Sequence, residues 1–577
     1  MKRYITILIA LCTMSLSASA QVTKQVEVTK EYAPEIGEAR KMDIAPNMVD
    51  TITLRPEIDY TITPRSFASA LGTHRFNPAT VTYWEYQRKY PFYLKFGAGY
   101  PLNTKGDLYA SAHRADVGYI TGYINHYGEY LRFKDYKSHR ANKTENRFGV
   151  MGGKYFGRYT LAGDLYYDLN SYSRYPSNDS YNRRKIDYND VKLAVNFGDS
   201  FADYSHINFK FYGSADIYTD NSKNFVKDDR YQQINASAGM ALAREITKRS
   251  ALSLNVDYKG YYGLKSLKSY KNSIVRATLL CRYRSGGLLD LSAGVKLYYD
   301  HNDAYVGKSD KLHGFPVVNL SLNIGDKGRA VPDVEVDGEL RNNSYYSLVK
   351  HNPYVSILGD GNGVLQGNIA LPNTDIYNVR FGVSGHSESS KFAYRFYANM
   401  SFILNDIYWY NVNQLFFDVV TANRNIWSLC GAVDYKPISQ LLITAQVKGS
   451  LYDDMAWYKG QSLAGTMPNL EAMLKVRYSH KKFALGLSAE LYGPTRWLSV
   501  YNESLFNEEA PISSEMYGIF KAPTALNLSL YADWHVSSTC TVFAEGNNLL
   551  GDVMPTYRWA FYRDMGASFT VGVKVQF

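Results

Sequence analysis

Residue types used in nucleophilic catalysis occur close together in one stretch of this sequence. GVSGHSES, from Gly382 to Ser389, contains three serines and a histidine. Neither Ser384 nor Ser387 fits the G-x-S-x-G pattern, in which the serine lies on a sharp turn from a strand into a helix. The flanking residues predict a strand, a turn and a second strand, so a β-hairpin is the better interpretation.

Motifs for metal or phosphate chemistry do not appear either. The 11 histidines are dispersed, and there is no H-E-x-x-H, C-x-x-C or phosphate-loop pattern. Acidic groups at Tyr452–Asp454 and Asn507–Pro511 offer oxygen ligands for Ca²⁺, although most such acids lie in solvated loops. We therefore expect no enzyme, no cofactor and no metal site. An enzyme with a Ser/His set at the rim of a barrel is an unsupported alternative.

The charges and cysteines narrow the class of protein further. The formal net charge is +10, but no dense run of Lys and Arg indicates nucleic-acid binding. Beyond Cys12, the cysteines are Cys281, Cys430 and Cys540. An odd number at wide spacing does not predict a disulfide framework.

The first twenty residues predict an export signal. Lys2 and Arg3 precede an apolar run, and Ala18 and Ala20 stand before Gln21, as small residues do at a signal-peptidase site. We expect cleavage after Ala20. A membrane anchor is the alternative for such a segment.

From about residue 91 to 577 the sequence alternates between apolar and polar residues. Leu526–Val536 and Leu252–Lys259 each place apolar side chains on one face and polar ones on the other, which predicts strands. Turn signals separate about 22 such segments. Longer connections are expected at Asp300–Gly314, Tyr345–Thr374 and Pro494–Pro523. Short turns alternating loosely with long loops are typical of outer-membrane barrels.

Composition and strand length favour a membrane barrel over a secreted β-sandwich or propeller. Aromatic residues make up 15% of the chain, with 52 tyrosines, and tyrosine suits a membrane interface. The mean hydropathy of −0.32 fits strands that are apolar on one face only. We expect an all-β chain that forms one large antiparallel transmembrane barrel with an even number of strands. A soluble secreted β-protein is the alternative.

The segment from 21 to 90 differs from the barrel sequence. It contains five widely spaced prolines, which remove backbone donors and predict an extended chain. It is too short for a sizeable core of its own. We expect it to lie in the periplasm or inside the barrel lumen.

The end of the chain carries two motifs. The pattern Thr570-x-Gly572-x-x-Val575-x-Phe577 resembles the C-terminal signal that directs insertion of outer-membrane barrels. Upstream, Asn548–Asp552 resembles the end of the penultimate strand in TonB-dependent receptors. The barrel sequence therefore resembles that family, and the segment 21–90 is shorter than the family's plug domain. The resemblance implies a relative without a plug.

This resemblance carries expectations for location and partners. It implies an outer-membrane protein with both mature termini in the periplasm, in contact with lipid and with the barrel-assembly machinery. A weak TonB-box-like stretch, Val26, Glu27, Val28 and Thr29, would offer a strand to a TonB-like energiser. A surface lipoprotein is a further candidate partner.

Two functions remain open from the sequence. The first is solute uptake or passage across the outer membrane. The second is a barrel that docks or scaffolds a periplasmic or surface partner, with its lumen closed by inward side chains and infolded loops.

Overall fold

The computed structural model describes residues 90–577, except 115, 133–139, 177–184, 202–204, 223–230, 266, 286, 304–308, 325–329, 356–370, 388–390 and 503–514. The predicted cleavage residues Ala18, Ala20 and Gln21 therefore lie outside the described residues. So do the TonB-box-like residues Val26–Thr29 and the segment 21–89.

Because apolar and polar residues alternate, each long strand has an outer and an inner face that differ in exposure. In β28 (Ser568–Gln576), Val571 is 58% exposed on the outer face, whereas Thr570 is 1% exposed on the inner face. The same pattern holds around the barrel. The strands of the wall are β1 (Phe92–Tyr100), β2 (Asn103–Arg114), β3 (Gly118–Arg132), β4 (Arg140–Phe156), β5 (Tyr159–Ser173), β6 (Lys185–Asp199), β7 (Asn208–Asp220), β8 (Tyr231–Thr247), β9 (Ser250–Lys265), β10 (Lys271–Arg284), β11 (Leu289–Asn302), β12 (Ser309–Leu322), β13 (Val331–Arg341), β14 (Thr374–His386), β15 (Phe392–Val412), β16 (Phe416–Ile438), β17 (Leu441–Asp454), β20 (Leu470–Ser479), β21 (Phe483–Tyr492), β24 (Ala525–His535), β25 (Cys540–Asn547) and β28.

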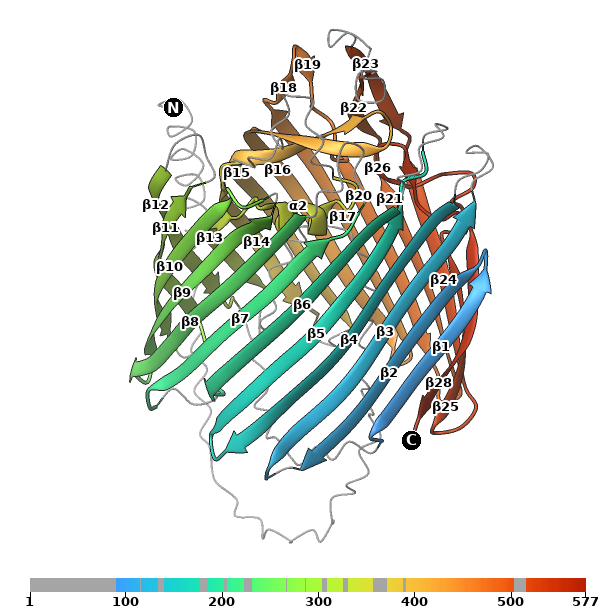
Figure 1. Cartoon of the computed structure of the whole chain (residues 1–577). Coiled ribbons are helices and arrows are strands. Elements are labelled where there is room, and N and C mark those ends of the chain that lie inside the picture. Colours follow the sequence, from blue (N-terminus) through green and yellow to red (C-terminus); the bar gives the residue numbers. More distant parts are fainter. Residues whose placement is uncertain are drawn as a thin grey trace, which may run out of the picture. The chain divides into compact units, whose positions relative to one another are not determined.

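These strands form a closed ring of 22 antiparallel strands (Figure 1). Each pairs with its neighbours, and β28 closes the ring against β1, where Gly97 stands opposite Gly572. Closure leaves no open edge in lipid, where an unpaired backbone group would cost several kcal/mol. The predicted barrel and its even strand number are confirmed.

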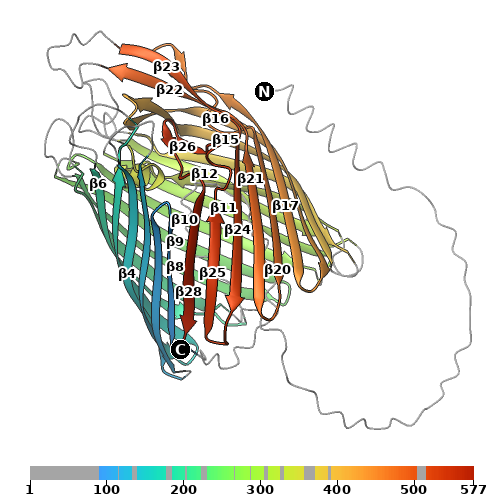
Figure 2. The ribbon, with the colours of Figure 1, turned by 90° about the vertical axis from the view of Figure 1, so that its right-hand side faces the viewer.

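The two rims of the barrel differ in their connections. Short turns, such as Lys248–Arg249 and Ser439–Gln440, join strands at the rim where Phe92 and Phe577 lie; we call this the short-turn rim. The long connections that follow β13, β17, β21 and β25 leave the wall at the opposite rim, which we call the long-loop rim. Figure 2 shows β22 (Thr495–Asn502) and β23 (Glu515–Ala522) at that end, away from the C-terminus.

Smaller elements occupy the long connections. They are α2 (Tyr345–His351), β18 (Trp457–Tyr458), β19 (Gln461–Ser462), β22, β23, β26 (Tyr557–Trp559) and β27 (Tyr562–Arg563). Within the described part of the chain, no helix has the length and apolar character needed to cross a membrane.

The outer face of the barrel is apolar. Val150 is 51% exposed and Leu165 is 50% exposed, and residues like them follow one another around the wall. Exposed aromatic side chains lie near both rims, as in the aromatic girdles of membrane barrels. Those near the short-turn rim include Phe92, Phe156, Phe392, Trp534 and Phe577, and those near the long-loop rim include Tyr100, Tyr299 and Phe569.

Candidate functional site

The connection between β13 and β14 begins with a capped helix. Ser344 is the N-cap of α2 and accepts a hydrogen bond from the Ser347 amide. Asn343 donates to Pro372 O at 2.7 Å and to Thr374 Oγ1 at 2.8 Å, so it ties the two ends of the connection together. A helix of 7 residues is not stable by itself, so its contacts with the barrel must hold it.

One side of α2 is held on the inner wall by polar contacts. Tyr345 Oη donates to Asp220 at 2.5 Å, and Tyr346 Oη donates to Asp190 at 3.0 Å. Lys350 Nζ lies 3.1 Å from the same Asp190 carboxylate. Strands β6 and β7 supply both acids, so they fix α2 to one side of the barrel.

Lys350 also balances a pair of like charges. Asp168 of β5 and Asp190 of β6 stand directly opposite each other in the ladder, an arrangement that is destabilising when uncompensated. Arg147 forms a bidentate pair with Asp168 at 2.6 and 2.9 Å, and Lys350 lies within 3.7 Å of both acids. The helix therefore contributes to the charge balance of the wall.

The opposite side of α2 packs into an aromatic cluster centred on Trp559. The Trp559 ring lies 5.4 Å from Trp409 and from Phe417, 5.5 Å from His351 and 5.6 Å from Trp497, measured between ring centroids. These rings come from four different connections or strand ends. We call this cluster, together with α2, the mouth closure.

The mouth closure spans the lumen. The buried core to which it belongs contains Ile186 of β6 and Tyr218 of β7 on one side, and Phe417 of β16 on the other. In a ring of 22 strands these positions lie on opposite sides. Contacts that join them must therefore cross the barrel, and Figure 1 shows α2 within the barrel at the level of the long-loop rim.

The hairpin of β15 and β16 changes direction beyond a bulge. The ladder register shifts between Ile403 and Asp406, and Asn405 has a φ of 56°. Beyond the bulge, the hairpin turns at Asn413 and Gln414, which have φ values of 52° and 61°. This outer part of the hairpin, residues 406–422, leaves the wall and enters the mouth closure.

The outer hairpin has an aromatic cluster on each face. Trp409 and Phe417 pack into the mouth closure, whereas Tyr410 and Phe416 pack with Leu498 of β22 and Leu463 in a second cluster. The hairpin also pairs in parallel with β22, with Val412 opposite Val500. Strand β22 therefore lies on the outer hairpin, and the other face of that hairpin packs into the mouth closure.

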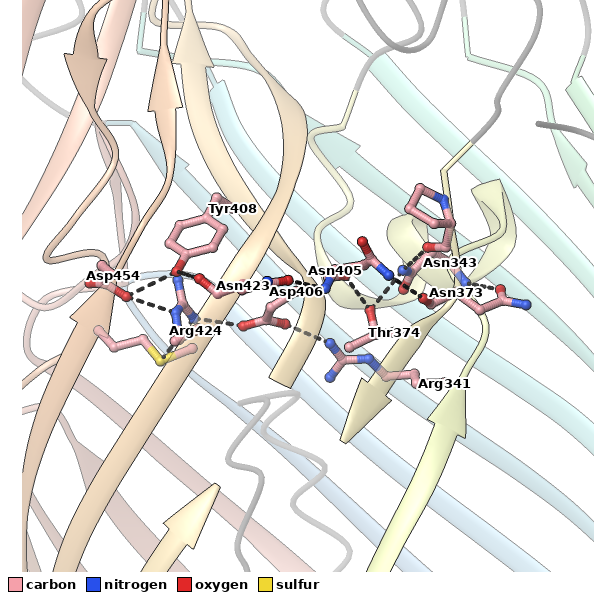
Figure 3. A network of polar contacts seen from close by, with 12 residues as sticks. Arg341, Asn343, Asn373, Thr374, Asn405, Asp406, Tyr408, Asn423, Arg424 and Asp454 are labelled. Atoms are coloured by element: carbon pink, nitrogen blue, oxygen red, sulfur yellow. Dashed lines mark hydrogen bonds and ion pairs between the residues drawn. The ribbon is translucent and has the colours of Figure 1, made fainter. Parts of the chain in front are cut away.

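A buried arginine fixes the hairpin at its bend (Figure 3). Arg424 of β16 is 1% exposed and contacts Asp406 at 2.9 Å and Asp454 at 2.8 Å. Its guanidinium lies 3.9 Å from the Tyr408 ring centroid, and Arg341 of β13 donates to Asp406 at 2.8 Å. These contacts join β13, β15, β16 and β17 at the point where the hairpin leaves the wall.

His351 makes the mouth closure sensitive to pH. Burial, and next the charges of Arg341 and Arg558, lower its pKa to about 4 from the ordinary 6.5. Between these values the closed form excludes a proton that an opened, hydrated His351 would bind. The contribution of neutral His351 to the closed form is therefore fully present well above pH 6.5 and is lost as the pH falls towards 4.

We expect acidification from pH 7 to pH 5 to disfavour the closed form by about 2 kcal/mol. The measurement is the open probability of single channels at the two pH values. His351→Phe keeps the stacking on Trp409 but has no proton to gain, so its channels should respond less to pH. An equal response in both proteins would contradict the assignment to His351.

A scan against protein-family models and a search of curated proteins find no match to this sequence. Solved structures do match. The FrpB iron transporter of Neisseria meningitidis has a TM-score of 0.63 at 10% identity, over 84% of this chain and 81% of that one.

Two further matches have the same architecture. The ferripyoverdine receptor FpvA of Pseudomonas aeruginosa has a TM-score of 0.60 at 10% identity, over 85% of this chain and 72% of that one. The copper transporter OprC has a TM-score of 0.59 at 13% identity, over 84% and 80%. The chain has the barrel fold of the TonB-dependent receptors.

The TonB-dependent receptor fold agrees with the resemblance seen at the end of the sequence. The matched structures are described as receptors and transporters, not as enzymes. Barrels of 22 strands are wide enough to need an obstruction of the lumen. In the described part of this barrel, α2 and the outer hairpin carry the cluster that crosses the lumen at the long-loop rim.

The sequence-predicted residues at the C-terminus lie elsewhere, where β28 meets β1. Phe577 stacks on Phe92 with ring centroids 5.2 Å apart, and the two residues exchange backbone hydrogen bonds at 2.9 and 3.1 Å. Thr570 Oγ1 donates to Asn103 Oδ1 at 2.6 Å. Gly572 and Val575 lie between Thr570 and Phe577, on β28. Their role in insertion remains a prediction.

The acidic and serine-containing stretches also have definite places. Asp454 of the Tyr452–Asp454 group contacts Arg424, so a cation of the protein already occupies its Oδ1. Asn507–Pro511 lies outside the described residues. Among the described residues, no group of three or more His, Cys, Asp or Glu is placed to hold a metal ion. In the GVSGHSES stretch, Gly382–His386 form the end of β14, and residues 388–389 lie outside the described residues.

The docking alternative anticipated infolded loops in the lumen, but the sequence did not indicate which residues would form the mouth closure. The available signals were the helical stretch YYSLVKH in a long connection and the aromatic density of YRWAFYR at 557–563. Neither stretch alternates with period 2. The first was therefore expected only as part of a long connection, and the second was given no structure of its own.

Proposed function

We propose that this chain is an outer-membrane receptor-type barrel that passes a solute through a gated lumen, with the mouth closure as the gate. The observation that carries the proposal is the aromatic cluster that crosses the barrel at the long-loop rim. Outer-membrane barrels place long loops outside the cell and short turns in the periplasm. The gate would then face the exterior, and Phe92 and Phe577 the periplasm.

Uptake is the function that the fold favours. Iron and copper transporters have the same barrel. The wall beneath α2 carries charged side chains, such as Arg147 and Asp168, that are suited to a hydrated path. A passive pore that is always open does not fit a mouth closed by packed aromatic rings. We propose further that the chain lacks a plug domain and that the mouth closure takes over the barrier.

Partners belong to the same proposal. Gating from the periplasm would require a TonB-like energiser, and gating from outside would suit a surface lipoprotein on the long-loop rim. Contact with lipid follows from the apolar outer face, and delivery of the chain would require the barrel-assembly machinery.

A docking or scaffolding barrel is the second candidate. The observation that favours it is the number of polar contacts that fasten α2, such as Tyr345 with Asp220 and Tyr346 with Asp190. A helix fastened in this way also suits a permanent seal.

Single-channel recording distinguishes the two functions. We expect the chain without residues 1–20, refolded in a planar bilayer, to be mostly silent with rare discrete openings. The pair Tyr346→Phe and Lys350→Ala removes two contacts to Asp190, and should raise the open probability at least about tenfold. Lys436→Ala, at an exposed position near the short-turn rim, is the control.

The outcomes separate the proposals. Frequent openings in the pair variant would show a path behind the closure and support gated passage. Silence in every variant that still folds would mean a sealed lumen and would favour docking. Steady conductance in the unmodified chain would contradict the mouth closure itself.

A further inference from the structure

The pairing of β28 with β1 is the seam of the barrel. Every other neighbouring pair of the ring is joined by a turn or loop, which restricts its register. The two seam strands stand at opposite ends of the barrel sequence. A slip of one residue would turn the apolar face inward, but a slip of two residues would preserve both faces. The alternating pattern therefore cannot select the register of the seam.

An aromatic ring crosses the seam at its middle. Gly97 of β1 stands opposite Gly572 of β28, and Gly572 stands opposite Phe543 of β25. The Phe543 side chain is 1% exposed. A Cβ on Gly97 would lie 2.8 Å from Phe543 Cζ, and one on Gly572 would lie 2.6 Å from the same ring. The ring from β25 therefore lies over β28 and reaches β1.

Charged side chains lie over the Phe543 ring and also connect β25 with the strands beyond β28. Lys95 Nζ lies 4.9 Å and Lys574 Nζ 5.3 Å from the Phe543 ring centroid. Glu545 of β25 pairs with Lys95 of β1 at 3.4 Å and with Lys105 of β2 at 2.5 Å. These ion pairs pass over β28, so β25 is connected directly to both strands beyond it.

We propose that Phe543, Gly97 and Glu545 form a clasp that selects the register in which the last strand closes the barrel. A slip that brings Lys95 opposite Gly572 would place a side chain where Gly97 leaves room for the ring. A slip the other way would bring Pro101, which has no amide donor, opposite Thr570 and would move Lys95 away from Glu545. The native register alone satisfies the ring and the ion pairs together.

A steric double-mutant cycle tests the clasp. Gly97→Ala should slow refolding of the full chain into vesicles by about tenfold, because a methyl group would meet the ring. Phe543→Ala removes the ring and leaves Thr570 Cγ2, at 3.1 Å, as the remaining close neighbour, so adding Gly97→Ala to it should have a much smaller effect than in the parent. Gly449→Ala is the control, because a methyl group there meets nothing within 4 Å. Additive effects of the two substitutions would overturn the steric part of the proposal.

Disulfide cross-linking tests the register directly. The parent carries Cys281→Ala, Cys430→Ala and Cys540→Ala. Paired cysteines at Ala98 and Val571, which are opposite each other in the ladder, report the native register. Cysteines at Ala98 and Phe569 report the slip that the ring should prevent.

The expected result is specific to the ring. The parent should cross-link only at the Ala98 and Val571 positions, and Phe543→Ala should also cross-link at Ala98 and Phe569. If Phe543→Ala keeps only the native cross-link, the register is selected elsewhere and the clasp is wrong.

Discussion

Replacing Trp559 with alanine is expected to shift the barrel from a closed to a frequently open state. Trp559 is 6% exposed and is the common neighbour of His351, Trp409, Phe417 and Trp497. Truncation of a buried tryptophan typically costs about 3–5 kcal/mol, because the contacts are lost and a cavity remains. The remaining rings come from separate connections, and without Trp559 they would lose the neighbour that they all contact.

Two measurements check this prediction. Single-channel recording should show an open probability at least about a hundredfold higher in Trp559→Ala than in the parent. Hydrogen exchange at the amides of Leu348 and Asn352, which bond within and at the end of α2, should accelerate similarly.

The control is Trp457→Ala. Trp457 lies on β18, also in a long connection, but is 64% exposed. Loss of the Trp457 side chain should change the free energy of unfolding by less than about 0.5 kcal/mol. Equal behaviour of the two variants would show that Trp559 does not hold the closure.

Replacing Arg424 with alanine should release the outer hairpin. The substitution would leave Asp406 and Asp454 buried, and Asp454 would lose the cation that contacts it. Breaking a buried pair by removing one partner costs about 3–5 kcal/mol, because the remaining charge is uncompensated. Arg341 would still contact Asp406, so the strain should concentrate at Asp454.

The readout is the accessibility of the hairpin turn. Protease cleavage near Asn413 and Gln414 should be faster in Arg424→Ala, and channel openings should be longer. The cleavage rate of Arg424→Lys should lie between those of the parent and of Arg424→Ala. A single ammonium group cannot reproduce the planar guanidinium that reaches both acids.

A matched arginine at the other rim provides the control. Arg282 is 45% exposed and pairs with Asp290, which is 32% exposed. Such an exposed pair contributes at most about 1 kcal/mol to stability. Arg282→Ala should therefore leave the turn at Asn413 and Gln414 as resistant to protease as it is in the parent. Equal cleavage in both variants would mean that Arg424 is not what holds the hairpin.

The wall of the barrel was predictable because its signal is local. Alternation along Leu526–Val536 is visible in a few residues, and β24 follows it from Ala525 to His535. Twenty-two such segments with one apolar face require a closed ring in lipid. Strand ends were less predictable. Asp300–Gly314 was expected as a long connection, but β11 continues to Asn302 and β12 begins at Ser309.

The mouth closure was not predictable in the same way. Tyr346 and Asp190, or Tyr175 and Tyr562, are far apart in sequence and meet only because the ring brings their strands together. Charge pairs such as Arg424 with Asp406 and Asp454 likewise carry no local signal.

The sequence alone determined the barrel and its approximate, even number of strands, because period-2 alternation and turn residues act over short distances. The motifs at the C-terminus added the resemblance to a family and the pairing role of the last strand. Tertiary structure alone decided that an aromatic cluster crosses the mouth of the barrel, which rings form it, and how Phe543 lies across the seam. These features depend on contacts between residues that are distant in the chain, and such contacts are fixed only once the ring has closed.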